Sequence, residues 1–197
     1  FVFPDFLNTL PYSQLRSGFA EMLKHGLIAD QKHWNDLISI KHLTAENLFP
    51  FIETSMKIKE RIVGQDFKEQ HIRKTLNFGH TIGHAIESLF LQTGTAIPHG
   101  EAVALGMICE SRLAFLINLI GEVDAENIIN NIRKFYPYLS ISQFSDDQIL
   151  PLMMNDKKNS SGKISFSLLK KIGEGNFDCE VSEKDLISTL QYYRNLN

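Results

Sequence analysis

The chain has 197 residues, a length that fits one domain or one domain with an appendage. Its composition, 43% hydrophobic and 22% charged, is that of an ordinary globular protein. A formal net charge of −3 gives no reason to expect nucleic acid as a partner, and no apolar run reaches the ~20 residues of a membrane span.

The cysteines and the start of the chain bear on its surroundings. Cys109 and Cys179 are too far apart in sequence to form a zinc knuckle, and two cysteines make no disulfide framework. We expect both to be reduced and buried in a cytoplasmic protein. The chain begins without Met and without a signal peptide, and residues 1–5 are typical of the end of a strand. This start predicts that the chain is a fragment of a longer enzyme.

Helical periodicity dominates most of the chain. After a short turn-rich segment, apolar residues recur at the spacing of a helix face. The predicted helices cover residues 12–28, 30–40, 49–66, 76–91, 100–119, 125–135 and 146–154. Thr44 is a predicted N-cap for a helix that follows it.

The period changes after Gly162. Ile164, Phe166 and Leu168 alternate with polar residues, which predicts a half-buried strand. Residues 173–176 form the predicted turn, residues 177–181 the return strand, and Ser182 caps a terminal helix. The predicted fold class is mainly α, a helical domain with one small antiparallel β-hairpin near the C-terminus. The sequence has no glycine-rich strand-to-helix turn and no βαβ alternation, so this chain alone should not bind NAD well.

Residues 73–87 (RKTLNFGHTIGHAIE) form the densest polar stretch. His80, His84 and Glu87 stand at i, i+4 and i+7, so one helix face presents two imidazoles and a carboxylate. Two histidines one turn apart can converge on one metal ion. The alternative is a pair of partly exposed histidines that make surface hydrogen bonds. The residues alone leave both interpretations open.

Two further places combine polar residues with unusual neighbours. His99 lies between Pro98 and Gly100, where a turn meets a long helix, so its imidazole can point inward, although such a histidine is more often structural. Glu21 and Lys24 stand at i and i+3, a spacing typical of an exposed salt bridge worth ~0.2–0.5 kcal/mol. Their apolar neighbours favour a functional pair instead.

Four motifs follow one another along the chain: residues 17–28 (SGFAEMLKHGLI), 76–87 (LNFGHTIGHAIE), 99–107 (HGEAVALGM), and a late DKK at 156–158 followed by GKI at 162–164. In this order they resemble the signature of the 3-dehydroquinate synthases. The resemblance spans most of the chain. It implies that residues 1–197 are the C-terminal metal- and substrate-binding domain of that family, and that the N-terminal NAD-binding α/β domain is absent from this chain.

The resemblance implies a metal ligand set different from the histidine pair. It assigns a divalent metal, Zn²⁺ or another such as Co²⁺, to Glu21, His80 and His99, and places His84 in contact with substrate. Three protein ligands with open positions are what a catalytic metal site requires. Glu87 is then expected to support the ligands or the fold.

Other residues match family positions that face the substrate. The implied catalytic residues are Lys24, Asn77 and His84. The implied substrate-binding residues are Lys59, Arg73, Lys157 and Lys158. The last two are alternatives for one lysine that reaches the phosphate end. Without the resemblance, Lys59 would be interpreted as one exposed lysine among several.

For the full-length enzyme the resemblance implies conversion of 3-deoxy-D-arabino-heptulosonate 7-phosphate to 3-dehydroquinate and phosphate. This is a lyase reaction of the shikimate pathway, which leads to chorismate and the aromatic amino acids. NAD would transiently oxidise the C5 alcohol beside a Lewis-acidic metal, and phosphate elimination and an intramolecular aldol would follow. We expect a small sugar acid phosphate as substrate, a homodimer when full length, and no activity from the fragment alone.

Three other functions remain as alternatives. A sister sugar-phosphate cyclase, such as 2-deoxy-scyllo-inosose synthase, would use a different sugar. A metal-dependent polyol dehydrogenase of the glycerol dehydrogenase type has a similar two-domain plan, but the Glu21–Lys24 pair and residues 77–87 favour the cyclases. A helical interaction module with a structural metal is disfavoured, because structural zinc sites usually have four Cys or His ligands.

Overall fold

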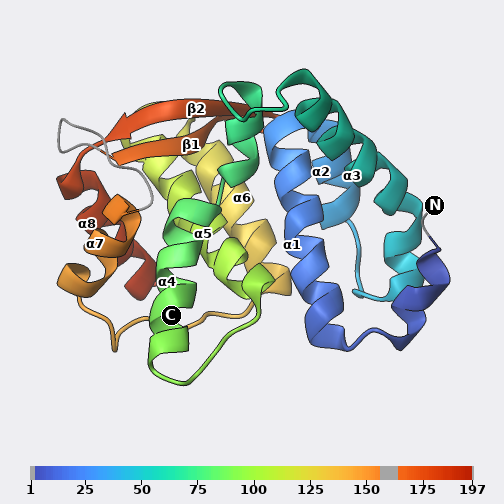
Figure 1. The fold of residues 1–197 in the computed structure, drawn as a ribbon, viewed down its shortest axis with the longest axis horizontal. Coiled ribbons are helices and arrows are strands. Elements are labelled where there is room, and N and C mark those ends of the chain that lie inside the picture. The colour runs from blue at the N-terminus through green and yellow to red at the C-terminus, as the bar shows by residue number, and fades with distance from the viewer. Residues whose placement is uncertain (1–2, 156–163, 197) are drawn as a thin grey trace.

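The computed structural model describes residues 3–155 and 164–196 (Figure 1). The elements in chain order are η1 (Pro4–Thr9), α1 (Tyr12–Ala29), α2 (Gln31–Ile38), α3 (Ala45–Gln65), η2 (Ile72–Asn77), α4 (His80–Gln92), α5 (His99–Leu116), α6 (Glu122–Phe135), α7 (Asp146–Asn155), β1 (Ile164–Lys171), β2 (Glu174–Val181) and α8 (Glu183–Arg194), where η denotes a 3₁₀-helix. The predicted fold class, a helical domain with one late antiparallel hairpin, is confirmed.

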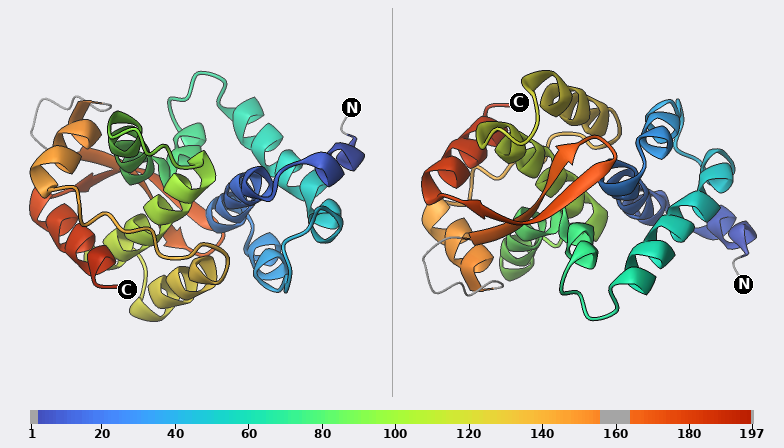
Figure 2. Two further views of the ribbon diagram at one scale, coloured as in Figure 1. Left: turned by 90° about the horizontal axis from the view of Figure 1, so that it is seen from below. Right: turned by 90° about the horizontal axis from the view of Figure 1, so that it is seen from above.

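Helix α5 lies at the centre of the molecule (Figure 1). It packs against α1, α4, α6, α8 and β1. Residues 102–111 are all buried, as expected for a helix that neighbours surround on every side. Helices α1–α3 lie on one side of it and α7 and α8 on the other, as all three views show (Figures 1 and 2).

The hairpin of β1 and β2 crosses one end of the helices (Figure 2, right). Its register pairs Ile164 with Val181 and Lys171 with Glu174, so the turn is Ile172–Gly173. The predicted turn at residues 173–176 is therefore wrong, because β2 already begins at Glu174. The reason is local: Gly173 has φ +86, a conformation suited to tight two-residue hairpin turns. Its N–H also donates to the Leu27 carbonyl at 2.8 Å.

The predicted alternation of β1 holds only in part. Ile164, Phe166 and Leu168 are buried as expected, but Ser167 on the opposite face is also buried. Its hydroxyl donates to the Lys74 carbonyl at 2.6 Å. The second face is covered because η2 packs against both strands.

The predicted helix over residues 76–91 begins too early. The structure has η2 up to Asn77, a break, and α4 from His80 onward. The break occurs at Gly79, which has φ +81. A Cβ at that position would lie 2.6 Å from Met107 Cγ and 2.9 Å from the Val103 carbonyl oxygen. The close contact between α4 and α5, rather than periodicity, therefore sets where α4 starts.

Several smaller predictions are confirmed. Thr44 and Ser182 are N-caps, and their side chains accept from Asn47 N–H and Asp185 N–H. Cys109 is free and buried, and so is Cys179. Among the described residues, none of the helices has both the length and the apolar character that a membrane span requires.

Candidate metal and substrate site

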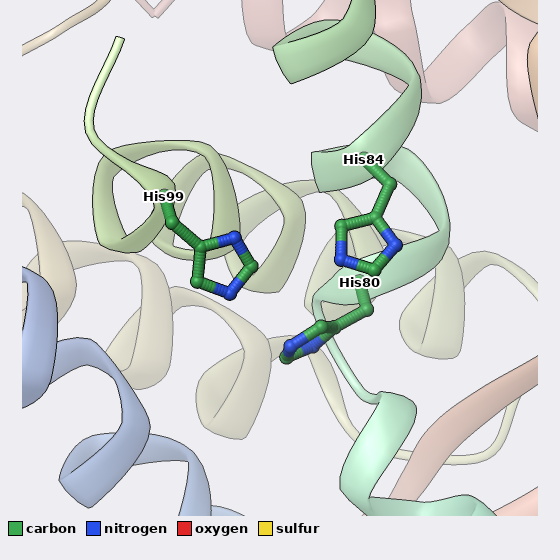
Figure 3. A group of neighbouring side chains, drawn as sticks. All are labelled: His80, His84 and His99. Atoms are coloured by element: carbon green, nitrogen blue, oxygen red, sulfur yellow. The ribbon is translucent and has the colours of Figure 1, made fainter.

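Three histidines from two helices converge at one place on the surface (Figure 3). His80 and His84 lie one turn apart on α4, and His99 is the first residue of α5. Their ring centroids are 5.0, 5.4 and 5.6 Å apart. One nitrogen from each ring can be chosen so that all three lie within 4.8 Å of one another.

Glu21 of α1 completes the cluster from a third helix. Its Oε1 lies 3.5 Å from His80 Nε2 and 3.9 Å from His99 Nε2. This oxygen is buried and has no hydrogen-bond partner, which is costly for a carboxylate. Ligand atoms that share a tetrahedral zinc ion stand about 3.4 Å apart, because each is about 2.1 Å from the metal. Glu21, His80 and His99 therefore fit a divalent ion.

His84 is also close enough to take part. Its ring is exposed and packs edge-on against His80. The pair at i and i+4 and the set from the family resemblance are thus both compatible with the geometry. What distinguishes the second set is Glu21, which supplies a negative charge and an unpartnered oxygen. The ligand set stays a prediction.

The other ring nitrogens of His80 and His99 have acceptors. His80 Nδ1 lies 3.2 Å from the Phe78 carbonyl oxygen, and His99 Nδ1 lies 3.2 Å from Glu87 Oε2. A carbonyl can only accept, so His80 must carry its proton on Nδ1 to make this bond. Hydrogen bonds of this kind fix the tautomer of metal-binding histidines and leave Nε2 free for the ion.

The charges at the site suit a cation. Lys24 is 3% exposed, and its Nζ donates to Glu21 Oε2 at 2.7 Å. Burial raises the pKa of Glu21, but the Lys24 ammonium outweighs it and the pKa falls below its usual value. Burial, with Lys24 nearby, lowers the pKa of His80 to about 4. Near neutral pH the cluster thus offers a carboxylate and an uncharged imidazole, the forms that bind metals.

Two contacts fix α1 against the start of α5. Gly100 N–H donates to Ser17 Oγ at 2.8 Å, and a Cβ on Gly100 would overlap the Ser17 backbone. Arg16 forms an ion pair with Glu101. These residues join the helix of Glu21 to the helix of His99. Sequence reasoning missed the Arg16–Glu101 pair, because no local pattern connects residues 85 positions apart.

Arg73 and Asn77 lie on η2 and share one acidic neighbour. Arg73 Nη1 donates to the Phe67 carbonyl at 2.8 Å, and its Nε lies 3.8 Å from Glu69 Oε2. Asn77 Nδ2 donates to Glu69 Oε1 at 2.8 Å. Glu69 has φ +55, an uncommon conformation for a non-glycine residue. No pattern in the sequence points to Glu69, since its position depends on the loop between α3 and η2.

Three predicted substrate-binding lysines remain: Lys59, Lys157 and Lys158. Lys59 is exposed on α3. Burial is the main cause that lowers the pKa of Lys24, and the charge of Lys59 lowers it further. Lys157 and Lys158 lie outside the described residues.

Comparison with known proteins gives a consistent result. The family described as 3-dehydroquinate synthase C-terminal matches residues 18–159. A 3-dehydroquinate synthase from Parabacteroides distasonis is 39% identical over 98% of this chain and 56% of its own length. One from Alkaliphilus metalliredigens is 39% identical over 95% of this chain and 53% of its own length. The chain thus spans about half the length of these relatives.

Two solved cyclase structures share the fold of this chain. The 2-epi-5-epi-valiolone synthase of Streptomyces hygroscopicus subsp. jinggangensis 5008, with NAD⁺ and Zn²⁺ bound, superposes with a TM-score of 0.83 at 22% identity, over 98% of this chain and 55% of that one. A 2-deoxy-scyllo-inosose synthase complexed with carbaglucose-6-phosphate, NAD⁺ and Co²⁺ gives 0.74 at 24% identity, over 97% and 54%. The family match and the sequence identities go further than this likeness of fold, and they show that the chain belongs to the 3-dehydroquinate synthase family, in its C-terminal part.

Proposed function

We propose that the chain is the metal- and substrate-binding part of an enzyme that converts 3-deoxy-D-arabino-heptulosonate 7-phosphate to 3-dehydroquinate and phosphate. The observation that carries the proposal is the cluster of Glu21, His80 and His99 beside the buried Lys24, in a chain of this family. The reaction is a carbon–oxygen lyase step of the shikimate pathway.

NAD would be bound by an N-terminal α/β domain outside residues 1–197. Two observations support this division. The relatives are nearly twice as long as this chain, and two related cyclases hold NAD⁺ in their solved structures. The whole enzyme would act in the cytoplasm as a homodimer, and residues 1–197 alone would not turn over substrate.

Glu21, His80 and His99 would hold one divalent ion, Zn²⁺ or Co²⁺. Their separations and the unpartnered Glu21 oxygen support this set. When bound, the ion supplies Lewis-acid polarisation of substrate oxygens, and NAD supplies reversible oxidation of the C5 alcohol.

The residues of the chain itself would bind and orient the substrate. Lys24 is held by Glu21 and presents a desolvated ammonium next to the ion site, where it can stabilise a developing negative charge on a substrate oxygen. His84 is exposed beside His80 and can hydrogen-bond to the substrate and transfer a proton. Asn77 would place an amide in the same region, and Lys157 or Lys158 would contact the phosphate.

Arg73, assisted by Lys59, would recognise the carboxylate that distinguishes the heptulosonate from the sugars of sister cyclases. A guanidinium suits bidentate capture of a carboxylate. Glu69 and the Phe67 carbonyl hold the Arg73 side chain in place, so less side-chain entropy is lost when substrate binds.

Single alanine variants test the ligand set by metal analysis. Glu21→Ala, His80→Ala and His99→Ala should each lose most of the bound metal, whereas His84→Ala should keep it and lose activity. Full occupancy in His99→Ala together with loss in His84→Ala would contradict this set and favour the histidine pair on α4.

A sister-cyclase activity is the second candidate, because two related cyclases share the fold. The two functions differ in the substrate, so comparing heptulosonate 7-phosphate with glucose 6-phosphate on the full-length enzyme separates them. Faster turnover of glucose 6-phosphate would make the sister cyclase the better description.

A further inference from the structure

Glu110 is an acidic residue inside the apolar central helix. It lies on α5, three turns beyond His99, and its exposure is 0%. Its carboxylate accepts two backbone hydrogen bonds from another helix: Oε2 from Gly79 N–H at 2.5 Å, and Oε1 from Ile82 N–H at 3.1 Å. The sequence shows it only as a charge that interrupts an apolar run.

These N–H groups belong to the start of α4. The first N–H groups of a helix have no intrahelical partner, and a side chain at the N-cap usually accepts from one of them. Here the N-cap is Gly79, which has no side chain, so the acceptor comes from α5 instead. A carboxylate is a strong acceptor at this position, because the helix dipole is positive there.

The packing between the helices leaves no room for a replacement. A Cβ on Gly106 would overlap the Gly79 carbonyl, and a Cβ on Gly83 would lie 2.8 Å from the Ala102 carbonyl oxygen. The backbones of α4 and α5 therefore touch directly next to the Glu110 contact. Water cannot easily take over the role of the carboxylate.

One of the two bonds connects Glu110 to the candidate metal ligand His80. Gly79 N–H and the Phe78 carbonyl are the two ends of a single peptide unit. Glu110 Oε2 accepts from the N–H end, while His80 Nδ1 lies 3.2 Å from the oxygen at the other end. Hydrogen bonds in series polarise one another, so the carboxylate makes the Phe78 carbonyl a better acceptor for the imidazole.

We propose that Glu110 is a positioning residue that orients His80 and fixes its tautomer through the Phe78–Gly79 peptide unit. The order is carboxylate, peptide, imidazole, ion. It places one peptide unit into the carboxylate–histidine–metal arrangement that tunes many metal sites. The role in metal binding rests on the ligand set proposed above, whereas the effect on the tautomer does not.

The test combines one variant with a matched control in the natural full-length protein. Glu110→Gln keeps the shape but replaces one carboxylate oxygen with an amide donor. Glu126→Gln makes the same change at a carboxylate that accepts from Tyr192 in another part of the molecule. We expect Glu110→Gln to weaken Zn²⁺ binding by about 10–100-fold in a competition titration with a chelator dye. Glu126→Gln should change it less than twofold.

A second readout separates positioning from stability. In metal-free protein with ¹⁵N-labelled histidine at pH 8, His80 should carry its proton on Nδ1 in the wild type and in Glu126→Gln. In Glu110→Gln it should become a mixture of tautomers. A variant that unfolds more readily but keeps the Zn²⁺ affinity and the His80 tautomer of the wild type would show a purely structural role and overturn the proposal.

If Glu110→Gln cannot be purified, the tautomer of His80 in the wild type still tests the proposal. An Nε2–H tautomer of His80 in the metal-free wild type would overturn the relay. Loss of Zn²⁺ binding on His84→Ala but not on His80→Ala would instead contradict the proposed ligand set. A wrong role for Glu110 and a wrong ligand set therefore give different experimental results.

Discussion

His25 follows Lys24 on α1 and is itself buried, at 5% exposure. Its Nδ1 lies 2.7 Å from Ser55 Oγ of α3. Burial and the Lys24 charge lower the pKa of His25 to about 3, so the folded protein keeps this imidazole neutral. The unfolded chain has no such constraint, and there the residue takes up a proton near its ordinary pKa of about 6.5.

Acid should therefore destabilise the protein through His25. The folded pKa is the lower one, so the stabilisation is complete above pH ~6.5 and is lost as the pH falls towards the folded pKa. Between pH 7 and 5 the contribution lost is about 2 kcal/mol, from ~1.4 kcal/mol per pH unit below the unfolded pKa. Urea denaturation at both pH values, with a chelator present, should show a smaller pH dependence in His25→Gln than in the wild type.

The control for this measurement is His42→Gln, which removes an exposed ring from the loop between α2 and α3. Its pH dependence should equal that of the wild type. An equal reduction in both variants would show that burial of His25 is not the cause.

Substrate recognition by Arg73 is the second prediction for a single residue. In the full-length enzyme, Arg73→Ala should reduce kcat/KM for the heptulosonate by ~10²-fold or more. The reason is the loss of the charge pair between Arg73 and the substrate carboxylate, since breaking a charge pair that is buried in a complex costs ~2–5 kcal/mol. Metal content should not change. Arg61→Ala, which removes an exposed arginine from α3, is the control. An intact kcat/KM in Arg73→Ala would contradict selection of the acid substrate by this residue.

At the scale of single residues, the sequence motifs led to one ligand set, which stays a prediction. Glu21, His80 and His99 come from three separate motifs, and the structure places them together. Glu69 and Glu110 were not predicted. Glu69 lies in a loop, and Glu110 lies three turns beyond His99 on the buried helix α5, so each reaches the site only through a loop conformation or a contact between helices. Tertiary structure alone creates such contacts.

The junction between η2 and α4 shows how one glycine sets the boundary of an element. The hydrophobic pattern of residues 76–91 runs through this junction without a break, so periodicity predicted one helix. The structure interrupts it at Gly79, where the backbone takes a positive φ against α5. The hairpin turn was misplaced for a related reason, since Gly173 is fixed by its contact with α1.

Gly79→Ala should therefore cost about 2–5 kcal/mol of folding stability. This adds about 1–2 kcal/mol for the left-handed backbone and about 1–3 kcal/mol for overpacking. Gly64→Ala is the matched control, because a Cβ at this exposed helical position meets nothing within 4 Å. It should leave stability unchanged or raise it by about 0.5–1 kcal/mol. Urea denaturation measures both, and equal effects would contradict the role of the α4–α5 contact.

For the molecule as a whole, the division of labour between domains can be tested directly. If NAD is held by a separate domain, the 197-residue chain should show no NAD binding with sub-micromolar affinity in calorimetry, while the full-length enzyme should. Zn²⁺ added to the chain should not change this result. Sub-micromolar binding by the 197-residue chain would contradict the proposed domain assignment.

The docking of the hairpin turn on α1 has a consequence for synthesis of the protein on the ribosome. The carbonyl of Leu27, one turn beyond Lys24, receives its hydrogen bond from Gly173, which is translated much later. At ordinary rates of synthesis this delay is roughly 10–30 s. During that time α1 emerges without the strands that pack against it, so its apolar face is available to chaperones.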